Sequence, residues 1–133
     1  MLLGLRNYTP DKWKKISVWT FAGGRMEPEE TIEEALRREV KEETGITNFE
    51  IHDIFAQLDG AREGDVIILF YCTTTEEPKL MEPEKFSEWR WVEFSEYIKN
   101  EEFKKINPIA HLVVSFYLQL QYDLSIWIGF LIA

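Results

Sequence analysis

The stretch "GGRMEPEETIEEALRREVKEETGI", residues 23–46, combines the spacing of a helix that packs against a core with a high density of glutamates. Thr31 and Glu34 have the spacing of a capping box, which satisfies the first free N–H groups of a helix. Gly45 stands where a left-handed residue ends a helix. These signals predict a helix from about residue 32 to about residue 44.

Three glutamates of the predicted helix lie on the side of its apolar residues. With roughly 100° of rotation per residue, Glu39, Glu42 and Glu43 fall inside or beside the sector of Leu36 and Val40. A solvated face with ion pairs one turn apart explains the other charges of the helix. It does not explain carboxylates clustered beside a core, which are unfavourable unless a cation neutralises them. Because the ligands would all be oxygens, Mg²⁺ or Mn²⁺ is favoured over zinc or copper.

The spacing of these residues also matches a known family. Gly24, Glu30 and the run from Arg38 to Ile46 occupy the specified positions of G-x5-E-x7-R-E-U-x-E-E-x-G-U, where U is aliphatic. This pattern resembles the signature of the Nudix hydrolases, and the similarity extends over about residues 1–100.

Two positions depart from the family pattern. Ala22 stands where a proline is common before the two glycines, and Glu29 stands where a glycine is common before Glu30. Neither position supplies a metal ligand in the family. The departures therefore concern the loop and the fit of a substrate more than catalysis.

The resemblance implies a fold and an activity. The fold would be an α/β/α sandwich with a mixed sheet, in agreement with strands and helices that interleave along the chain. The activity, in the MutT-like branch, would be metal-dependent hydrolysis of a pyrophosphate bond in a nucleoside di- or triphosphate derivative, with water attacking phosphorus. A nucleotide-sugar hydrolase is the nearest alternative. A Nudix domain that only binds a ligand, as a sensor, is another, but sensors usually lose box carboxylates that are all present here.

The resemblance also implies a metal site. Glu39, Glu42 and Glu43 would bind Mg²⁺ or Mn²⁺, and the carbonyl oxygen of Gly24 would complete the ligand set. Arg38 lies four residues before Glu42, so it can hold a carboxylate in place by an ion pair.

The general base that accepts a proton from the attacking water stays open at this stage. Glu42 or Glu39 could act within the box, and Glu82 or Glu84 could act from a distant loop. Glu30, just before the helix, resembles the box glutamate that supports the metal ligands or the loop.

Aromatic and basic residues outside the box are the candidates for substrate binding. Trp19, Phe21 or Trp89 could stack on a base, and Arg6 could contact phosphates together with lysines of the loop that follows it. The plainer interpretation of the aromatics is that they belong to the core. His52 and His111 have no motif around them and are not expected to act.

Composition agrees with one small enzyme domain. The 133 residues can bury a single core, and the net charge of −9 disfavours nucleic-acid binding, which needs a basic surface. The single cysteine, Cys72, cannot form an internal disulfide, so a reducing, cytoplasmic location is expected.

The periodicity predicts strands and helices along the rest of the chain. Polar, Gly- or Pro-containing segments separate them. The predicted strands cover residues 2–6, 16–21, 49–57, 66–73 and 87–94, and a second helix covers about residues 108–122.

The run "LSIWIGFLIA" at residues 124–133 follows the domain expected over residues 1–123 and has no counterpart in the family. It is too short for a membrane span. Relatives usually have a further strand before the one that matches residues 2–6, so the sheet is expected to have an open edge. We therefore expect residues 124–133 to be buried, either as a strand that covers this edge or as a contact of a homodimer.

Overall fold

The computed structural model describes residues 1–7, 18–60, 62–105, 108–119 and 126–132, and the side chains of 126 and 127 are not described. Among the described residues, no helix is long and apolar enough to cross a membrane. The elements in chain order are β1 (Leu2–Arg6), β2 (Trp19–Thr20), β3 (Ala22–Arg25), α1 (Ile32–Thr44), β4 (Glu50–Asp59), β5 (Val66–Thr73), β6 (Phe86–Trp91), α2 (Phe94–Lys99), the short 3₁₀ helix η1 (Glu101–Lys104), α3 (Pro108–Leu118) and β7 (Ile126–Ile132).

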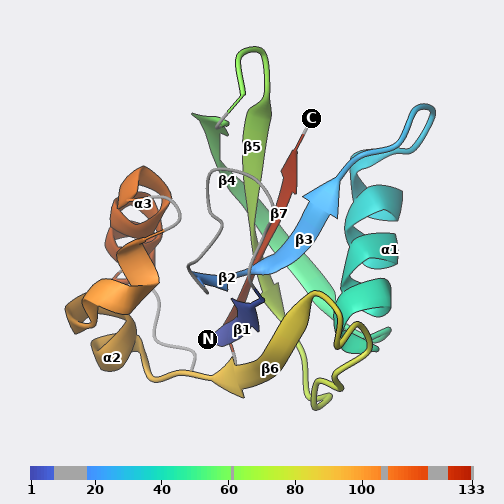
Figure 1. The fold of residues 1–133 in the computed structure, drawn as a ribbon. Coiled ribbons are helices and arrows are strands. Elements are labelled where there is room, and N and C mark those ends of the chain that lie inside the picture. The colour runs from blue at the N-terminus through green and yellow to red at the C-terminus, as the bar shows by residue number, and fades with distance from the viewer. Residues whose placement is uncertain (8–17, 61, 106–107, 120–125, 133) are drawn as a thin grey trace.

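Two sheets lie between helices. One has the strand order β2-β1-β6 and is antiparallel, and the other has the order β3-β7-β5-β4. The second sheet is mixed, because β3 and β7 are parallel while β5 is antiparallel to both of its neighbours. Figure 1 shows α1 on one side of the sheets and α2 and α3 on the other. The predicted α/β/α sandwich with a mixed sheet is confirmed.

Helix α1 has the predicted bounds and caps. The Thr31 hydroxyl accepts from the Glu34 N–H at 3.1 Å, the Glu34 side chain accepts in return, and Gly45 ends the helix at a φ of 73°. The apolar stripe packs on the sheet, where Leu36 is fully buried and lies against Gly129 of β7. Helix α1 is thereby fixed to one face of this sheet.

Other predicted elements needed correction. Of the strand expected at 16–21, residues 16 and 17 lie outside the described part. In the remainder only Trp19 and Thr20 form a strand, β2 of the first sheet, and the separate strand β3, which the sequence did not predict, begins at Ala22 in the second sheet. The strand expected at 87–94 ends at Trp91, and α2 begins at Phe94. Helix α3 ends at Leu118, and the sequence did not predict α2 or η1.

Residues 126–132 of the apolar run form a strand in an interior position of the sheet. Strand β7 pairs with β3 on one side and with β5 on the other, with Phe130 opposite both Gly23 and Leu69. The expectation of a strand that covers an open edge was therefore wrong about the position, since β3 and β4 are the edges of this sheet. Ile128 and Leu131 are fully buried, so β7 contributes to the core on both faces of the sheet.

Candidate active site

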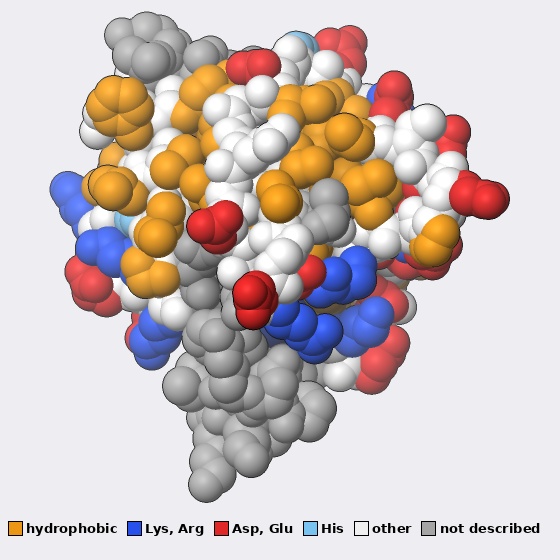
Figure 2. Space-filling view, turned by 90° about the horizontal axis from the view of Figure 1, so that it is seen from above, with side chains coloured by type: hydrophobic (Ala, Val, Ile, Leu, Met, Phe, Trp, Pro, Cys, Tyr) orange, Lys and Arg blue, Asp and Glu red, His pale blue; other side chains and the backbone are white. Residues whose placement is uncertain are grey.

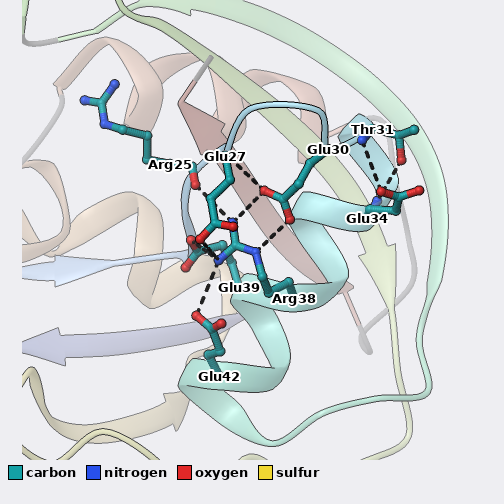
Figure 3. Close-up of polar contacts among 8 residues, drawn as sticks. All are labelled: Arg25, Glu27, Glu30, Thr31, Glu34, Arg38, Glu39 and Glu42. Carbon is teal, nitrogen blue, oxygen red and sulfur yellow. Dashed lines mark hydrogen bonds and ion pairs between the residues drawn. The ribbon is translucent and has the colours of Figure 1, made fainter.

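Arg38 is the centre of the polar network on α1. Its guanidinium donates twice to Glu30, with Nε 2.7 Å from Oε2 and Nη2 2.8 Å from Oε1, and Nη1 donates to Glu39 at 2.9 Å and to Glu42 at 3.4 Å. Figure 3 shows these carboxylates converging on the one guanidinium. The hydrogen bonds from Arg38 lower the pKa of Glu30 to about 2. Arg38 thus ties the loop before α1 to two candidate metal ligands.

The loop before α1 has a strained backbone conformation at Glu29, one of the positions where the sequence departs from the family pattern. Residues 27–30 form a tight turn in which the Glu30 N–H donates to the Glu27 carbonyl at 3.3 Å. Glu29 adopts a φ of 70°, after Pro28, as in a type II turn, where glycine is the favoured residue. The side chain at position 29 is therefore held in a conformation that only glycine adopts without cost.

Glu29→Gly is expected to stabilise the protein by about 0.5–1 kcal/mol, because glycine relieves the left-handed strain but adds entropy to the unfolded chain. Denaturant unfolding measures the difference. Glu29→Ala is the matched control, since it removes the same carboxylate and keeps a Cβ atom. A gain in stability from alanine as large as that from glycine would show that charge, not strain, is the cause.

Gly24 leaves room for the Glu39 carboxylate. A Cβ atom at Gly24 would lie only 2.7 Å from Glu39 Oε1 and closer still to the other oxygen, which is nearer than atoms can approach without displacement. Burial raises the pKa of Glu39, and the hydrogen bond from Arg38 opposes this effect. The backbone of Gly24 and the Glu39 carboxylate are therefore close neighbours, as they must be if both bind the same metal ion.

Glu43 is the most deeply buried carboxylate of the helix. It is 7% exposed, and its Oε1 accepts the N–H of Gly23 at 2.8 Å. Burial raises the pKa of Glu43 to about 8, the negative charges of Glu39 and Glu82 add to this, and the Gly23 N–H opposes it. The sequence placed Glu42 beside the same apolar sector, but its side chain is 51% exposed.

The distant loop contributes Glu82 rather than Glu84. Glu82 is 19% exposed and pairs with Lys85 at 3.0 Å, whereas Glu84 is exposed. In the described part of the chain, Glu82 Oε1 is buried and has no hydrogen-bond partner. Asn7 holds this turn, since its N–H donates to the Lys85 carbonyl at 2.8 Å and its side chain donates to the Pro83 carbonyl at 2.9 Å. No sequence signal pointed to Asn7.

These donors fit a hard divalent cation by chemistry. Among the described residues, no three His, Cys, Asp or Glu side chains already stand together as a metal-binding group. Arg38 donates to one oxygen of Glu39 and one of Glu42, and the Gly23 N–H donates to one oxygen of Glu43, so each carboxylate has a second oxygen that could bind an ion. The all-oxygen donor set suits such an ion, which would also neutralise the negative charges of Glu39 and Glu82 that act on the buried Glu43.

A cavity of about 310 Å³ lies on the sheet face opposite α1 and contains three of the four predicted substrate residues. Arg6, Trp19 and Phe21 line it, and in the described part of the chain the buried Nε of Arg6 has no partner. Among the described residues that line it, the arginines are Arg6, Arg25 and Arg62, and the single acidic residue is Asp65. The lining is thus net positive in a protein with a net charge of −9. On the face seen in Figure 2, Lys and Arg side chains gather beside hydrophobic ones.

Trp89 and His111 both differ from the expectations of the sequence analysis. The Trp89 ring packs over Gly4, and its Nε1 donates to the Glu43 carbonyl at 3.1 Å, so Trp89 holds the end of α1 instead of lining the cavity. His111, which was not expected to act, does line the cavity. Only its place on the buried side of α3 could have indicated this, and no local motif marks it.

Strand β3 connects the cavity to the carboxylates. Successive residues of a strand point to opposite faces. Gly24 lies against Glu39 on the α1 side, whereas the side chain of the next residue, Arg25, lines the cavity and pairs with Asp65 through Nη1 at 3.1 Å and Nη2 at 2.8 Å. The carboxylates themselves are not part of the cavity wall.

Comparison with known proteins agrees with this architecture. The chain is 44% identical over 59 residues to the nucleoside triphosphatase NudI of Enterobacter sp. (strain 638). This match covers 44% of this chain and 39% of that protein. It is 34% identical over 91 residues to NudI of Salmonella arizonae, covering 59% of this chain and 64% of that protein. A putative nudix hydrolase 1 of Caenorhabditis elegans is 40% identical over 74 residues, which is 53% of this chain and 20% of that protein.

The chain spans less than two thirds of the length of each of these relatives. The match to the family model is more extensive, because it begins at residue 1 and ends at residue 112 of the 133 residues. The complete box, the sandwich fold and this match lead to one conclusion: the chain belongs to the family of NUDIX domains.

Proposed function

We propose that this protein is a metal-dependent hydrolase that cleaves a pyrophosphate bond in a nucleoside di- or triphosphate derivative. The observation that carries this proposal is a set of interacting carboxylates: Glu39 lies against Gly24 and shares Arg38 with Glu42, and the charges of Glu39 and of Glu82, from a separate loop, act on the buried Glu43. The names of the relatives, two of them nucleoside triphosphatases, support the same class of substrate.

Each residue has a role in this proposal. Glu39, Glu42, Glu43 and the carbonyl of Gly24 would hold Mg²⁺ or Mn²⁺, which neutralises charge on the phosphate oxygens and lowers the pKa of water. Arg38 keeps Glu39 and Glu42 oriented toward the centre of the site.

The proton of the attacking water needs an acceptor. Glu39 and Glu42 already accept hydrogen bonds from Arg38 and would bind the ion in this proposal, so we do not assign the acceptor to them. Glu82 has one carboxylate oxygen without a partner among the described residues, and we assign the general base to it. The cavity would hold the base of the substrate, with Trp19 and Phe21 against its ring and Arg6 at its edge.

A screen for hydrolysis tests this function. Nucleoside triphosphates, modified nucleotides, nucleotide sugars, ADP-ribose and dinucleotide polyphosphates are incubated with Mg²⁺ or Mn²⁺, and phosphate or pyrophosphate release is measured. We expect turnover of a nucleoside di- or triphosphate derivative and none in the presence of a chelator. Preferred turnover of nucleotide sugars would indicate the neighbouring branch of the family. Specific binding without turnover of any compound would indicate a sensor and contradict the proposal.

A further inference from the structure

We propose that β7, through Phe130, determines which nucleobase this protein accepts. This inference rests on the proposed function for its biological meaning, but the site it describes can be tested by binding alone. The family match ends at residue 112, so the comparison assigns no role to residues 126–132.

The register of β7 places one face of this strand in the cavity wall. Gly129 and Leu131 lie on the α1 side, where Gly129 contacts Leu36 and Leu131 belongs to the same core cluster as Leu36. Phe130 and Ile132 alternate with them and line the cavity on the opposite face. The tail therefore supplies part of the surface that a ligand would contact.

The walls around Phe130 suit a flat, apolar ring. Phe21, Trp19 and Tyr97 line the same cavity, and all three rings are packed within the aromatic cluster of this layer. A volume of about 310 Å³ is small for a ligand site, so the size of the side chain at position 130 controls a substantial part of the space.

The polar groups of the cavity suit the edge of a heteroaromatic base. Nε2 of His111 lies 2.7 Å from the Tyr97 carbonyl, which can only accept, so Nε2 carries the hydrogen. In the neutral ring, Nδ1 is then an acceptor. Arg6 adds a donor, since its buried Nε has no partner in the described part of the chain. Apolar walls with a donor and an acceptor are the chemistry that recognises a nucleobase.

Position 130 can be changed without altering the carboxylates. The Phe130 backbone pairs with Gly23, whose N–H holds Glu43, and substitutions of the side chain leave this pairing in place. Variants of Phe130 should therefore change affinity for the base while the rate of bond cleavage at saturation stays near its original value.

The test uses Phe130→Trp, which fills the cavity, and Phe130→Leu, which removes the ring but keeps apolar bulk. Leu112→Ala is the matched control, because Leu112 is 69% exposed on α3 and does not line the cavity. Isothermal titration with AMP, GMP, CMP and UMP without metal measures binding. KM and kcat for the corresponding triphosphates measure its effect on turnover, and thermal melting checks that each variant is folded.

We expect the unmodified protein to bind at least one of these monophosphates and Phe130→Trp to weaken that binding by about tenfold or more. Phe130→Leu should change the ratio of purine to pyrimidine affinity by about threefold or more, with KM affected more than kcat. If Phe130→Trp does not fold, Phe130→Leu alone decides. Leu112→Ala should change neither property.

The outcomes separate this inference from the proposed function. Binding that depends on residue 130, without hydrolysis of any nucleotide, would contradict the function and support the inference. Base preference and affinity that are unchanged in a folded Phe130→Leu variant would overturn the inference, whether or not the protein hydrolyses nucleotides. Absence of monophosphate binding by the unmodified protein would overturn it as well.

Discussion

Glu43→Gln is expected to lower kcat by about 100-fold or more and, at the same time, to stabilise the metal-free protein. The two effects have one origin. Glutamine preserves an oxygen that can accept the Gly23 N–H, so the local backbone stays in place, but it removes the negative charge that a divalent ion would bind. Without a cation the buried carboxylate must either stay charged or take up a proton, and both are unfavourable at neutral pH, so the substitution removes this cost.

The pH dependence of stability follows from the same group. Burial raises the pKa of Glu43 from 4.5 to about 8, so the folded metal-free protein holds a proton that the unfolded chain releases. The resulting destabilisation is absent below the unfolded pKa of 4.5, grows as the pH rises, and is complete above about 8. At pH 7 it amounts to roughly 3 kcal/mol. This loss of stability with rising pH should be present in the unmodified protein and missing in Glu43→Gln.

Denaturant unfolding in chelator between pH 5 and pH 8, approximately, measures the stability, and single-substrate kinetics with Mg²⁺ measures kcat. Glu33→Gln is the control, because Glu33 lies on the outward face of α1 and pairs with Arg37 at 3.0 Å. It should leave kcat unchanged. Equal losses of kcat from Glu33→Gln and Glu43→Gln would show that the inward face of the helix has no special role.

Truncation after residue 123 is expected to abolish cooperative folding. Strand β7 is hydrogen-bonded on both sides, so its loss leaves β3 and β5 without a common neighbour. The removal of Ile128 and Leu131, both fully buried, would by itself cost about 4–10 kcal/mol, which is comparable with the whole stability of a domain, about 5–15 kcal/mol.

Circular dichroism on heating and light scattering detect the loss of the cooperative transition and any aggregation. A matched pair of point variants tests the same idea in the full chain. Leu131→Asp places a charge in the core and should unfold the protein, whereas Leu112→Asp changes an exposed position and should have little effect. A truncated protein with an unchanged melting temperature and an unchanged oligomeric state would show that the tail has no structural role.

Local signals made α1 predictable. Its capping box and its terminal glycine lie within the helix and its immediate neighbours, and they agree with the apolar period that fixes the buried face. The position of β7 could not be predicted in this way. An apolar run indicates burial, but pairing with β3 and β5 is a contact between segments far apart in the chain, and no local pattern encodes it.

The same distinction holds within the candidate site. The spacing of the box identified Glu39 and Glu43 as inward-facing, because the helical period places both on the side of the apolar residues. It could not choose between Glu82 and Glu84, since that choice depends on how a remote turn docks on Asn7. The sequence also named Trp89 as a candidate for stacking, and a long-range hydrogen bond to α1 gives it a different position.

The opposite orientations of Gly24 and Arg25 on β3 have a consequence for how this domain can diverge. Under the proposed function, substitutions on the cavity side of the strand would alter the molecule that is held, and substitutions on the α1 side would alter the chemistry performed on it. A gene duplicate could therefore acquire a new substrate by mutation while every carboxylate is retained. A directed-evolution library aimed at new substrates should vary Phe21, Arg25 and Phe130 and leave the helix untouched.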